Sequence, residues 1–183
     1  GESFCLLPRL NLAGLVAETL FEKGEKGLKS FKVKVGLPIR MAAAERLPTT
    51  KEIIEKLGKC AVESKYDGFR LQVHKDGDKV DIFSRNQERM THMFPDVAEG
   101  IKKQLNAKKA IIEGEALAYN EETGEIFPFQ VTITRKRKHG IAELSKDLPL
   151  VIFLFDILYL DGEDITGLGY EERRKIMEKT LKK

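Results

Sequence analysis

The chain has 183 residues, of which 42% are hydrophobic, so it is long enough for one domain of ordinary size with a real core. Its net charge is only +3 although 33% of the residues are charged, and this balance predicts neither a broadly basic nor a broadly acidic surface. No segment is long and apolar enough for a membrane span, and two distant cysteines suit neither a disulfide framework nor a metal site.

The first predicted element is an amphipathic helix over residues 11–23, where apolar side chains recur on one stripe and Gly24 is the expected stop. A short β-like stretch follows at residues 31–35. The helix has no partner nearby in the sequence. Residues 1–30 are therefore predicted to be the tail of a preceding helical domain, and residues 31–183 to form the main domain.

A second, short helix is predicted over residues 51–57. Thr49 is the expected N-cap, and Glu52 follows it three residues later, which is the pattern of a capping box. Gly58 is the expected end of this helix, because glycine readily adopts the backbone conformation that closes one.

Strands are predicted from Cys60 onward. Residues 61–65 are expected to lead into a turn at Asp67-Gly68. Residues 69–74 then alternate between apolar and polar side chains, which predicts a half-buried strand with one polar face. A hairpin turn is predicted at residues 75–78, because Gly77 accepts a positive φ, and the return strand at residues 79–84.

The second half of the chain predicts two further strands and two helices. A helix over residues 95–105 begins with Pro95 at its first position. Residues 110–119 are predicted to be a strand interrupted by a Glu-Gly-Glu sequence, and residues 151–160 a nearly all-apolar strand flanked by buried surfaces. The tail over residues 170–183 is predicted to be a charged helix. Strands joined by hairpins, with a few helices, predict an α+β fold with mainly antiparallel sheets.

The sequence Lys65-Tyr66-Asp67-Gly68-Phe69-Arg70 is the strongest chemical signal. A lysine before a tight Asp-Gly turn is held with its amine over the space that the turn opens, and the guanidinium of Arg70 can hold a phosphate or a ribose oxygen. A lysine nucleophile must lose its proton, which nearby cations favour, and Arg70, Arg85 or a divalent metal ion could supply that charge. The alternative is a solvated lysine beside an ordinary turn.

This Lys-x-Asp-Gly-x-Arg element resembles the signature of the covalent nucleotidyltransferases, the superfamily of ATP- and NAD-dependent ligases and mRNA capping enzymes. Three later elements resemble the family's motifs in the same order: Ser84-Arg85-Asn86, Glu113-Gly114-Glu115 and Phe155-Asp156. Taken singly, they also fit a surface arginine, a turn carboxylate and a core aromatic residue. Their order favours the family, which implies Lys65 as the catalytic residue, Glu63, Arg70, Arg85, Glu115 and Phe155 as nucleotide contacts, and Glu115 as a metal ligand.

A basic run narrows the resemblance further. Pro128-Phe129-Gln130 followed by Arg135, Lys136, Arg137 and Lys138 is similar to a stretch of the replicative DNA ligases of archaea and eukaryotes. Four successive cations repel one another unless an anion lies against them. Such a run is commonly a solvated loop, but here a DNA phosphate backbone is the better partner, so these four residues are predicted to bind DNA.

The resemblance implies most of the adenylation domain of an ATP-dependent DNA ligase, with the covalent nucleotidyltransferase (ATP-grasp-like) fold. Lys65 would form a lysyl-AMP intermediate, AMP would pass to the 5′-phosphate of a nick, and the 3′-hydroxyl would then seal it. The cofactors implied are ATP and Mg²⁺ or Mn²⁺, and the partner is nicked double-stranded DNA in replication, repair or recombination. A sliding clamp is a candidate partner of the full-length enzyme.

The same resemblance predicts that this chain is a fragment. Two later family motifs, a Glu-Gly pair and a Lys-x-Lys sequence, are expected to lie outside it, together with the OB-fold and most of the helical DNA-binding domain, of which residues 1–30 would be the tail. The first residues lack a secretory signal, so a cytoplasmic, DNA-associated protein without a membrane partner is expected. Abundant Lys and Glu favour a thermophilic source.

Two other functions stay open at this point. One is a different covalent nucleotidyltransferase, such as an RNA ligase, against which the basic run and the first helix argue. The other is a non-catalytic nucleic-acid-binding fragment, which predicts that ATP does not stabilise the protein.

Overall fold

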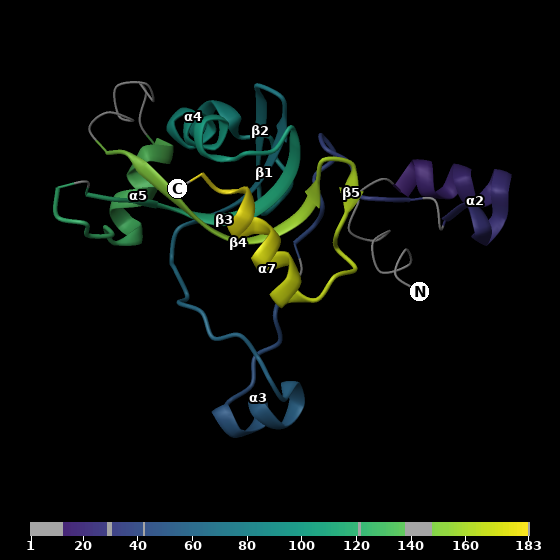
Figure 1. The fold of residues 1–183 in the computed structure, drawn as a ribbon, viewed down its shortest axis with the longest axis horizontal. Coiled ribbons are helices and arrows are strands. Elements are labelled where there is room, and N and C mark those ends of the chain that lie inside the picture. Colours follow the sequence, from purple (N-terminus) through teal and green to yellow (C-terminus); the bar gives the residue numbers. More distant parts are fainter. Residues whose placement is uncertain (1–12, 29–30, 42, 121, 138–147, 183) are drawn as a thin grey trace.

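The computed structural model describes residues 13–28, 31–41, 43–120, 122–137 and 148–182, and it has the α+β architecture that the sequence predicts. Five strands form one antiparallel sheet in the order β2-β1-β3-β4-β5. The strands are β1 (Phe69–Asp76), β2 (Lys79–Ser84), β3 (Lys109–Ala118), β4 (Leu150–Leu160) and β5 (Glu163–Asp164). The helices are α2 (Ala13–Leu28), α3 (Thr50–Leu57), α4 (Pro95–Gln104), α5 (Phe129–Arg137) and α7 (Tyr170–Thr180), with a 3-10 turn η2 at Thr91–Met93. In Figure 1 the strands curl around one another with α4 and α7 close to them, while α3 projects away from the sheet.

The β1–β2 hairpin forms as the sequence predicts. Its turn contains Gly77 at φ +58°, a conformation that costs glycine little, and the strands pair from Leu71 with Ser84 to Asp76 with Lys79. On its other edge β1 pairs antiparallel with β3, from Phe69 with Ala116 to Asp76 with Lys109. This central strand therefore connects the lysine motif to the Glu-Gly-Glu motif.

One face of the sheet carries the main hydrophobic core. Leu71 and Val73 of β1 and Ile112 of β3 are buried there. Val97 and Ile101 of α4, and Leu105 directly after this helix, are the predicted inward residues, and they pack on the same core. Burying one such aliphatic side chain contributes roughly 1.5–3 kcal/mol, so this cluster dominates the stability of the sheet. The α4 prediction is confirmed.

The opposite face of the sheet is closed by residues 31–40, here called the covering segment. Val33 and Ile39 of this segment pack on Ile111 of β3 and Leu158 of β4. The predicted strand at residues 31–35 is wrong, because the N–H groups of Val33, Gly36 and Ile39 donate to side chains and, within the described residues, the covering segment pairs with no neighbouring strand. The N–H of Val33, for example, donates to Asp164 Oδ2 at 3.0 Å.

The covering segment also corrects the prediction of a half-buried β1. The polar side chains of Gln72 and His74 project onto this face, where they are 0% and 1% exposed. Alternation in a strand predicts a polar face open to water. Here the covering segment supplies hydrogen-bond partners for that face and excludes solvent from it.

Helix α3 begins and ends where the sequence predicts. Thr49 has an extended backbone, and its Oγ1 accepts a hydrogen bond from the N–H of Glu52 at 3.2 Å. Gly58 closes the helix at φ +64°. In α2, Gly24 at φ +61° interrupts the helical backbone at the predicted stop, although one further turn follows to Leu28.

Three other predictions need correction. Residues 61–65 form no strand, and β3 runs without the predicted interruption. Residues 151–156 of β4 are only half-buried, because pockets border this part of the strand. The sequence predicts no element over residues 129–137, where helix α5 forms, and the buried Thr132 of this helix accepts a hydrogen bond from the N–H of Ala118 at 3.1 Å. Within the described ranges, none of the helices has the length and apolar character needed to cross a membrane.

Candidate active site

Lys65 is exposed on the irregular segment before β1, and it lines a cavity of about 760 Å³. Three other predicted site residues line the same cavity: Arg70, Arg85 and Glu115. Residues 61–65 pair with no strand, so the lysine lies outside the sheet, and in place of the predicted Asp-Gly turn the chain has a bend at Gly68 just before β1. The cavity is lined by one amine, three guanidinium groups and four carboxylates, which are those of Lys65, Arg46, Arg70, Arg85, Glu45, Asp67, Glu88 and Glu115.

Gly68, three residues after Lys65, connects this segment to β3 by a hydrogen bond. Its N–H donates to Glu115 Oε1 at 3.1 Å. A Cβ at position 68 would lie 2.3 Å from the carbonyl oxygen of Ala116, and a Cβ on Gly114 would lie 2.8 Å from the carbonyl oxygen of Phe153. Side chains at either position would push the strands apart, so the glycine of each motif is required by the close approach of the backbone.

Glu115 faces the cavity in a partly dehydrated environment. Burial raises the pKa of its carboxyl group, while the N–H of Gly68 and the charges of Arg70 and Lys65 oppose that rise. A further cation or a hydroxyl donor in the cavity would favour the ionised form. The geometry therefore suits a carboxylate that contacts a ligand hydroxyl or a metal ion.

Arg70 lies between a carboxylate and an aromatic ring. Its Nη2 is 2.7 Å from Glu113 Oε2, and its Cζ lies 4.1 Å from the ring centroid of Phe155. A cation stacked on an aromatic face gains roughly 0.5–2 kcal/mol. These two contacts fix the plane of the guanidinium at the wall of the cavity.

Arg85 is exposed on the tight turn after β2. Ser84 Oγ accepts hydrogen bonds from the N–H groups of Asn86 at 3.2 Å and Glu88 at 3.3 Å. Gln87, at φ +66°, donates from its Nε2 to the carbonyl oxygen of Pro38 at 2.7 Å. The turn that presents Arg85 is thus braced internally and tied to the covering segment.

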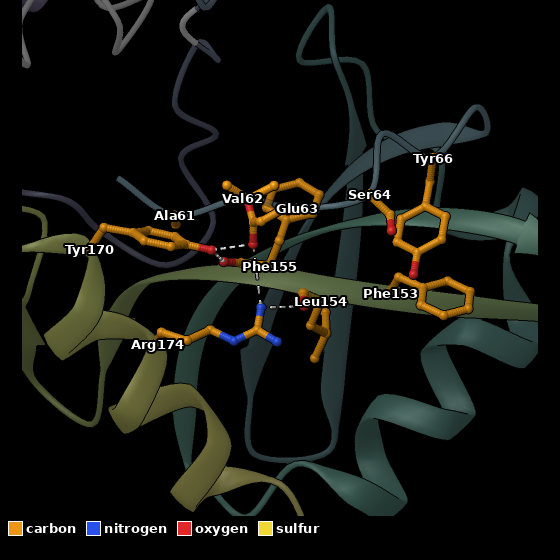
Figure 2. A pocket seen from close by; sticks show the side chains of 10 residues that line it. All are labelled: Ala61, Val62, Glu63, Ser64, Tyr66, Phe153, Leu154, Phe155, Tyr170 and Arg174. Atoms are coloured by element: carbon orange, nitrogen blue, oxygen red, sulfur yellow. Dashed lines mark hydrogen bonds and ion pairs between the residues drawn. The ribbon is translucent and has the colours of Figure 1, made fainter. Parts of the chain in front are cut away.

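Glu63 and Phe155 line a second pocket of about 510 Å³ (Figure 2). The hydroxyl of Tyr170 donates to Glu63 Oε1 and lies 3.2 Å from the carbonyl oxygen of Phe155. Arg174 Nη1 donates to the carbonyl oxygen of Leu154 at 3.2 Å and lies 3.8 Å from Glu63 Oε1. Burial, reinforced by Glu63, raises the pKa of Tyr170 to about 12, so this hydroxyl keeps its proton and acts as a donor.

The two pockets are neighbours. Tyr66 lines both of them, and its ring stacks on Phe153 with 4.4 Å between the centroids. Arg70 lines the first pocket and packs on Phe155, which lines the second. The predicted site residues are therefore divided between two adjacent pockets and are not gathered in one.

The basic run is described only in part. Arg135, Lys136 and Arg137 form the end of α5, while Lys138 lies outside the described residues. The prediction that these residues bind DNA stays a prediction.

Sequence reasoning missed several residues that shape these pockets. Glu113 belongs to the Glu-Gly-Glu motif but has no predicted role, and Gln72 is predicted only to lie on the polar face of a strand. Tyr170 and Arg174 carry no motif, and only their place on a charged helix near the end of the chain marks them. Among the residues that the structure describes, no three His, Cys, Asp or Glu side chains come together in a group that could hold a metal ion.

Basic side chains from β1, from the segment before it and from the turn after β2 line one cavity, and guanidinium groups of this kind can hold a phosphorylated ligand. Residues 41–183 match the family described as the ATP dependent DNA ligase domain. The chain belongs to this family.

Similar proteins agree with the family assignment. A probable DNA ligase of Dictyoglomus turgidum is 56% identical over 168 residues, which are 92% of this chain and 29% of that protein. DNA ligase 2 of Thermofilum pendens is 47% identical over 169 residues, or 92% of this chain and 28% of that protein. The chain thus spans less than a third of the length of these relatives, which come from thermophilic archaea and bacteria. The solved structure titled mycobacterial DNA ligase D complexed with ATP and MES is 26% identical, covers 65% of this chain and 36% of that one, and has a TM-score of 0.49.

Proposed function

We propose that this chain is the nucleotide-binding part of an ATP-dependent DNA ligase and that Lys65 is its nucleophile. The observation that supports this most is the shared cavity of Lys65, Arg70, Arg85 and Glu115 in a member of the ligase domain family. The neutral amine of Lys65 attacks the α-phosphorus of ATP, a P–N bond forms, the bond to the pyrophosphate oxygen breaks and pyrophosphate leaves. The amine proton passes to solvent, and a lysyl-AMP phosphoramidate results.

The two pockets suit different parts of the nucleotide. Phe155 offers a ring face for the purine, and Glu63 offers a carboxylate that accepts from its amino group. The cavity with Arg70 and Arg85 takes the phosphates, where fixed guanidinium groups stabilise the charge that develops during phosphoryl transfer. Glu115 then lies within the same cavity to accept from a ribose hydroxyl.

The residues present also fit a divalent cation. Mg²⁺ is commonly held by one or two carboxylates together with substrate phosphates, so it does not require three protein ligands. Glu115 and Asp67 line the cavity and are close enough for the charge of Asp67 to raise the pKa of Glu115. A bound Mg²⁺ or Mn²⁺ would neutralise phosphate charge, and Glu115 with Asp67 would hold it.

The remaining steps concern the whole protein. AMP passes to the 5′-phosphate of a DNA nick, and the 3′-hydroxyl displaces it, as part of DNA replication, repair or recombination. Arg135, Lys136, Arg137 and Lys138 contact the DNA backbone, and residues 1–30 belong to a helical DNA-binding domain. The protein acts on DNA inside the cell, and a sliding clamp is a candidate partner.

The adduct is the direct test of this function. The full-length protein is incubated with α-labelled ATP and a divalent cation, and the labelled peptide is mapped by mass spectrometry. We expect one AMP on Lys65. Lys65→Ala and Lys65→Arg should both abolish the label, because a guanidinium stays protonated and cannot attack. Lys51→Arg is the matched control, because Lys51 is exposed on α3 and makes only an exposed ion pair with Glu55.

Three results would contradict the proposed nucleophile, the proposed catalytic activity or the proposed substrate. Label on a different lysine would remove Lys65 as the nucleophile, and a protein that ATP neither labels nor stabilises would be a non-catalytic nucleic-acid-binding module. Faster sealing of nicked RNA than of nicked DNA would make the protein an RNA ligase. Equal labelling of wild type and the Lys51 variant is required for each of these conclusions.

A further inference from the structure

Three polar side chains form a buried row beside the cavity. Gln72, His74 and Glu113 are 0%, 1% and 4% exposed, and they lie between the sheet and the covering segment. Burying polar groups is costly unless each finds hydrogen-bond partners, and an apolar row of similar volume is often at least as stable. On the other face of the sheet, Leu71 and Val73 of β1 are apolar and pack in the main core. The polar row therefore calls for an explanation other than stability.

Its hydrogen bonds run in one direction. The N–H of Gly36 donates to His74 Nδ1 at 2.9 Å, which places the ring proton on Nε2. Nε2 then donates to Gln72 Oε1 at 2.9 Å, and the N–H of Ile39 donates to the same oxygen at 2.8 Å. With its oxygen turned to two donors, the Gln72 amide directs its Nε2 to Glu113 Oε1 at 2.8 Å and to the carbonyl oxygen of Ile39 at 3.1 Å.

The row ends on Arg70. Glu113 accepts from Gln72 at Oε1 and from Arg70 Nη2 at Oε2, so both of its oxygens are engaged and its carboxylate plane is fixed. A fixed carboxylate sets the direction of the guanidinium that it holds. Arg70 then projects past Phe155 to the cavity wall. The position of the covering segment is transmitted to Arg70 through three buried side chains.

The same segment reaches the second arginine. Pro38, one residue before Ile39, accepts the hydrogen bond from Gln87 Nε2, and Gln87 belongs to the turn that presents Arg85. Residues Met41, Ala43 and Ala44, directly after the segment, line the cavity itself. One stretch of chain is thus in contact with the supports of both arginines.

We propose that Gln72 and His74 are positioning residues that set the orientation of Arg70 for nucleotide binding through Glu113, with the covering segment as their anchor. This inference rests on the proposed function, because it assigns the role to the nucleotide cavity. Under this proposal, replacing Gln72 or His74 lowers kcat/KM for lysyl-AMP formation because Arg70 is misplaced. Replacing an ordinary core residue lowers only the stability of the sheet.

The test is a double-mutant cycle in the full-length protein. Gln72→Met keeps the volume but removes the amide that holds Glu113. We expect it to lower kcat/KM for lysyl-AMP formation about tenfold, mainly through KM for ATP. In an Arg70→Ala background the same substitution should cost less than about twofold, because the residue through which it acts is gone. Single-turnover labelling with α-labelled ATP resolves the slow variants.

Three further variants separate an effect on the position of Arg70 from an effect on stability. Val73→Ala alters the neighbouring residue of β1, which is buried in the main core, and should lower Tm while leaving KM for ATP within about twofold. His74→Gln keeps an acceptor for Gly36 and a donor for Gln72, whereas His74→Leu keeps neither. We expect the leucine variant to raise KM for ATP several-fold and the glutamine variant to restore it. The two His74 variants test the positioning role even if Gln72→Met fails to fold.

The outcomes are distinct. The proposal would be overturned if Gln72→Met caused the same loss of activity in the wild-type and Arg70→Ala backgrounds. It would also be overturned if Val73→Ala and Gln72→Met lowered Tm equally and raised KM for ATP equally. Identical KM values for the two His74 variants would also overturn it. Failure of the wild-type protein to form any adduct is a different result, because it refutes the proposed function itself.

Discussion

The buried imidazole of His74 should give the protein a pH-dependent stability that one substitution removes. Its ring is 1% exposed beneath the covering segment and packs edge-on against Phe83, with 4.9 Å between the centroids. Burial lowers the pKa of His74 from 6.5 to about 4, although the negative charge of Asp81 on the neighbouring strand partly opposes this shift. The folded protein therefore holds His74 neutral at pH values where the unfolded chain binds a proton.

The size and sign of the effect follow from these values. Between pH 6.5 and about 4 the unfolded state binds more protons at this position, so the free energy of unfolding falls as the pH falls through this range. A lowering of the pKa from 6.5 to about 4, at about 1.4 kcal/mol per unit, is a loss of about 3 kcal/mol. The contribution is fully present above pH 6.5 and is exhausted below about pH 4.

The measurement is urea unfolding of the protein and of His74→Gln at about pH 7 and about pH 4. Carboxylates such as Asp81 titrate in both proteins, so the difference between their two losses isolates the imidazole. We expect the wild type to lose about 3 kcal/mol more than the variant. His92→Gln, which alters an exposed histidine of η2, should behave as wild type. Equal losses for wild type and His74→Gln would refute the buried, neutral state of this ring.

Two further predictions concern the base pocket and the basic run. Tyr170→Phe removes the donor that holds Glu63, so KM for ATP should rise about fivefold and the preference for ATP over GTP should weaken, as measured by adduct formation with each nucleotide. Tyr159→Phe on β4 is the control, and an unchanged preference in Tyr170→Phe would contradict a role of this tyrosine in choosing the base. Replacing Arg135 and Arg137 by glutamine should reduce the salt dependence of nick binding by up to about two units while lysyl-AMP formation stays nearly unchanged. A double variant that loses adduct formation but keeps its salt-sensitive affinity for nicked DNA would refute the DNA contact.

Local signals predicted those parts of the fold in which neighbouring residues decide the structure. Thr49 and Gly58 delimit α3 because capping needs only groups within one turn. Gly77 closes the β1–β2 hairpin because its positive φ is a local requirement. The lysine motif and its companions were likewise found from short patterns, and the structure places Lys65, Arg70, Arg85 and Glu115 around one cavity.

The remaining errors have non-local causes. The β-like pattern at residues 31–35 has Val33 and Val35 alternating with lysines, but the N–H of Val33 donates to Asp164 of β5 and that of the next glycine, Gly36, to His74 of β1, both far along the chain. Helix α5 was not predicted at all, because residues 129–134 are rich in β-branched side chains, which disfavour a helix, and its Thr132 accepts a hydrogen bond from β3. Division of the site into two pockets depends on where Tyr170 and α7 come to lie, which no pattern around Glu63 reveals.

The polar face of β1 shows why a motif is an incomplete description of a site. Arg70, Gln72 and His74 recur at every second position, so all three project from the same face of the strand. The motif ends at Arg70, which is the only one of these three polar residues that lines the cavity. The strand itself continues the same polar row under the covering segment, where Gln72 and His74 are enclosed and fully bonded. Alternate side chains of a strand project from the same face, so buried residues at one end of β1 can orient a ligand-binding residue at its other end. In β1, the buried Gln72 and His74 can in this way orient Arg70 at the cavity.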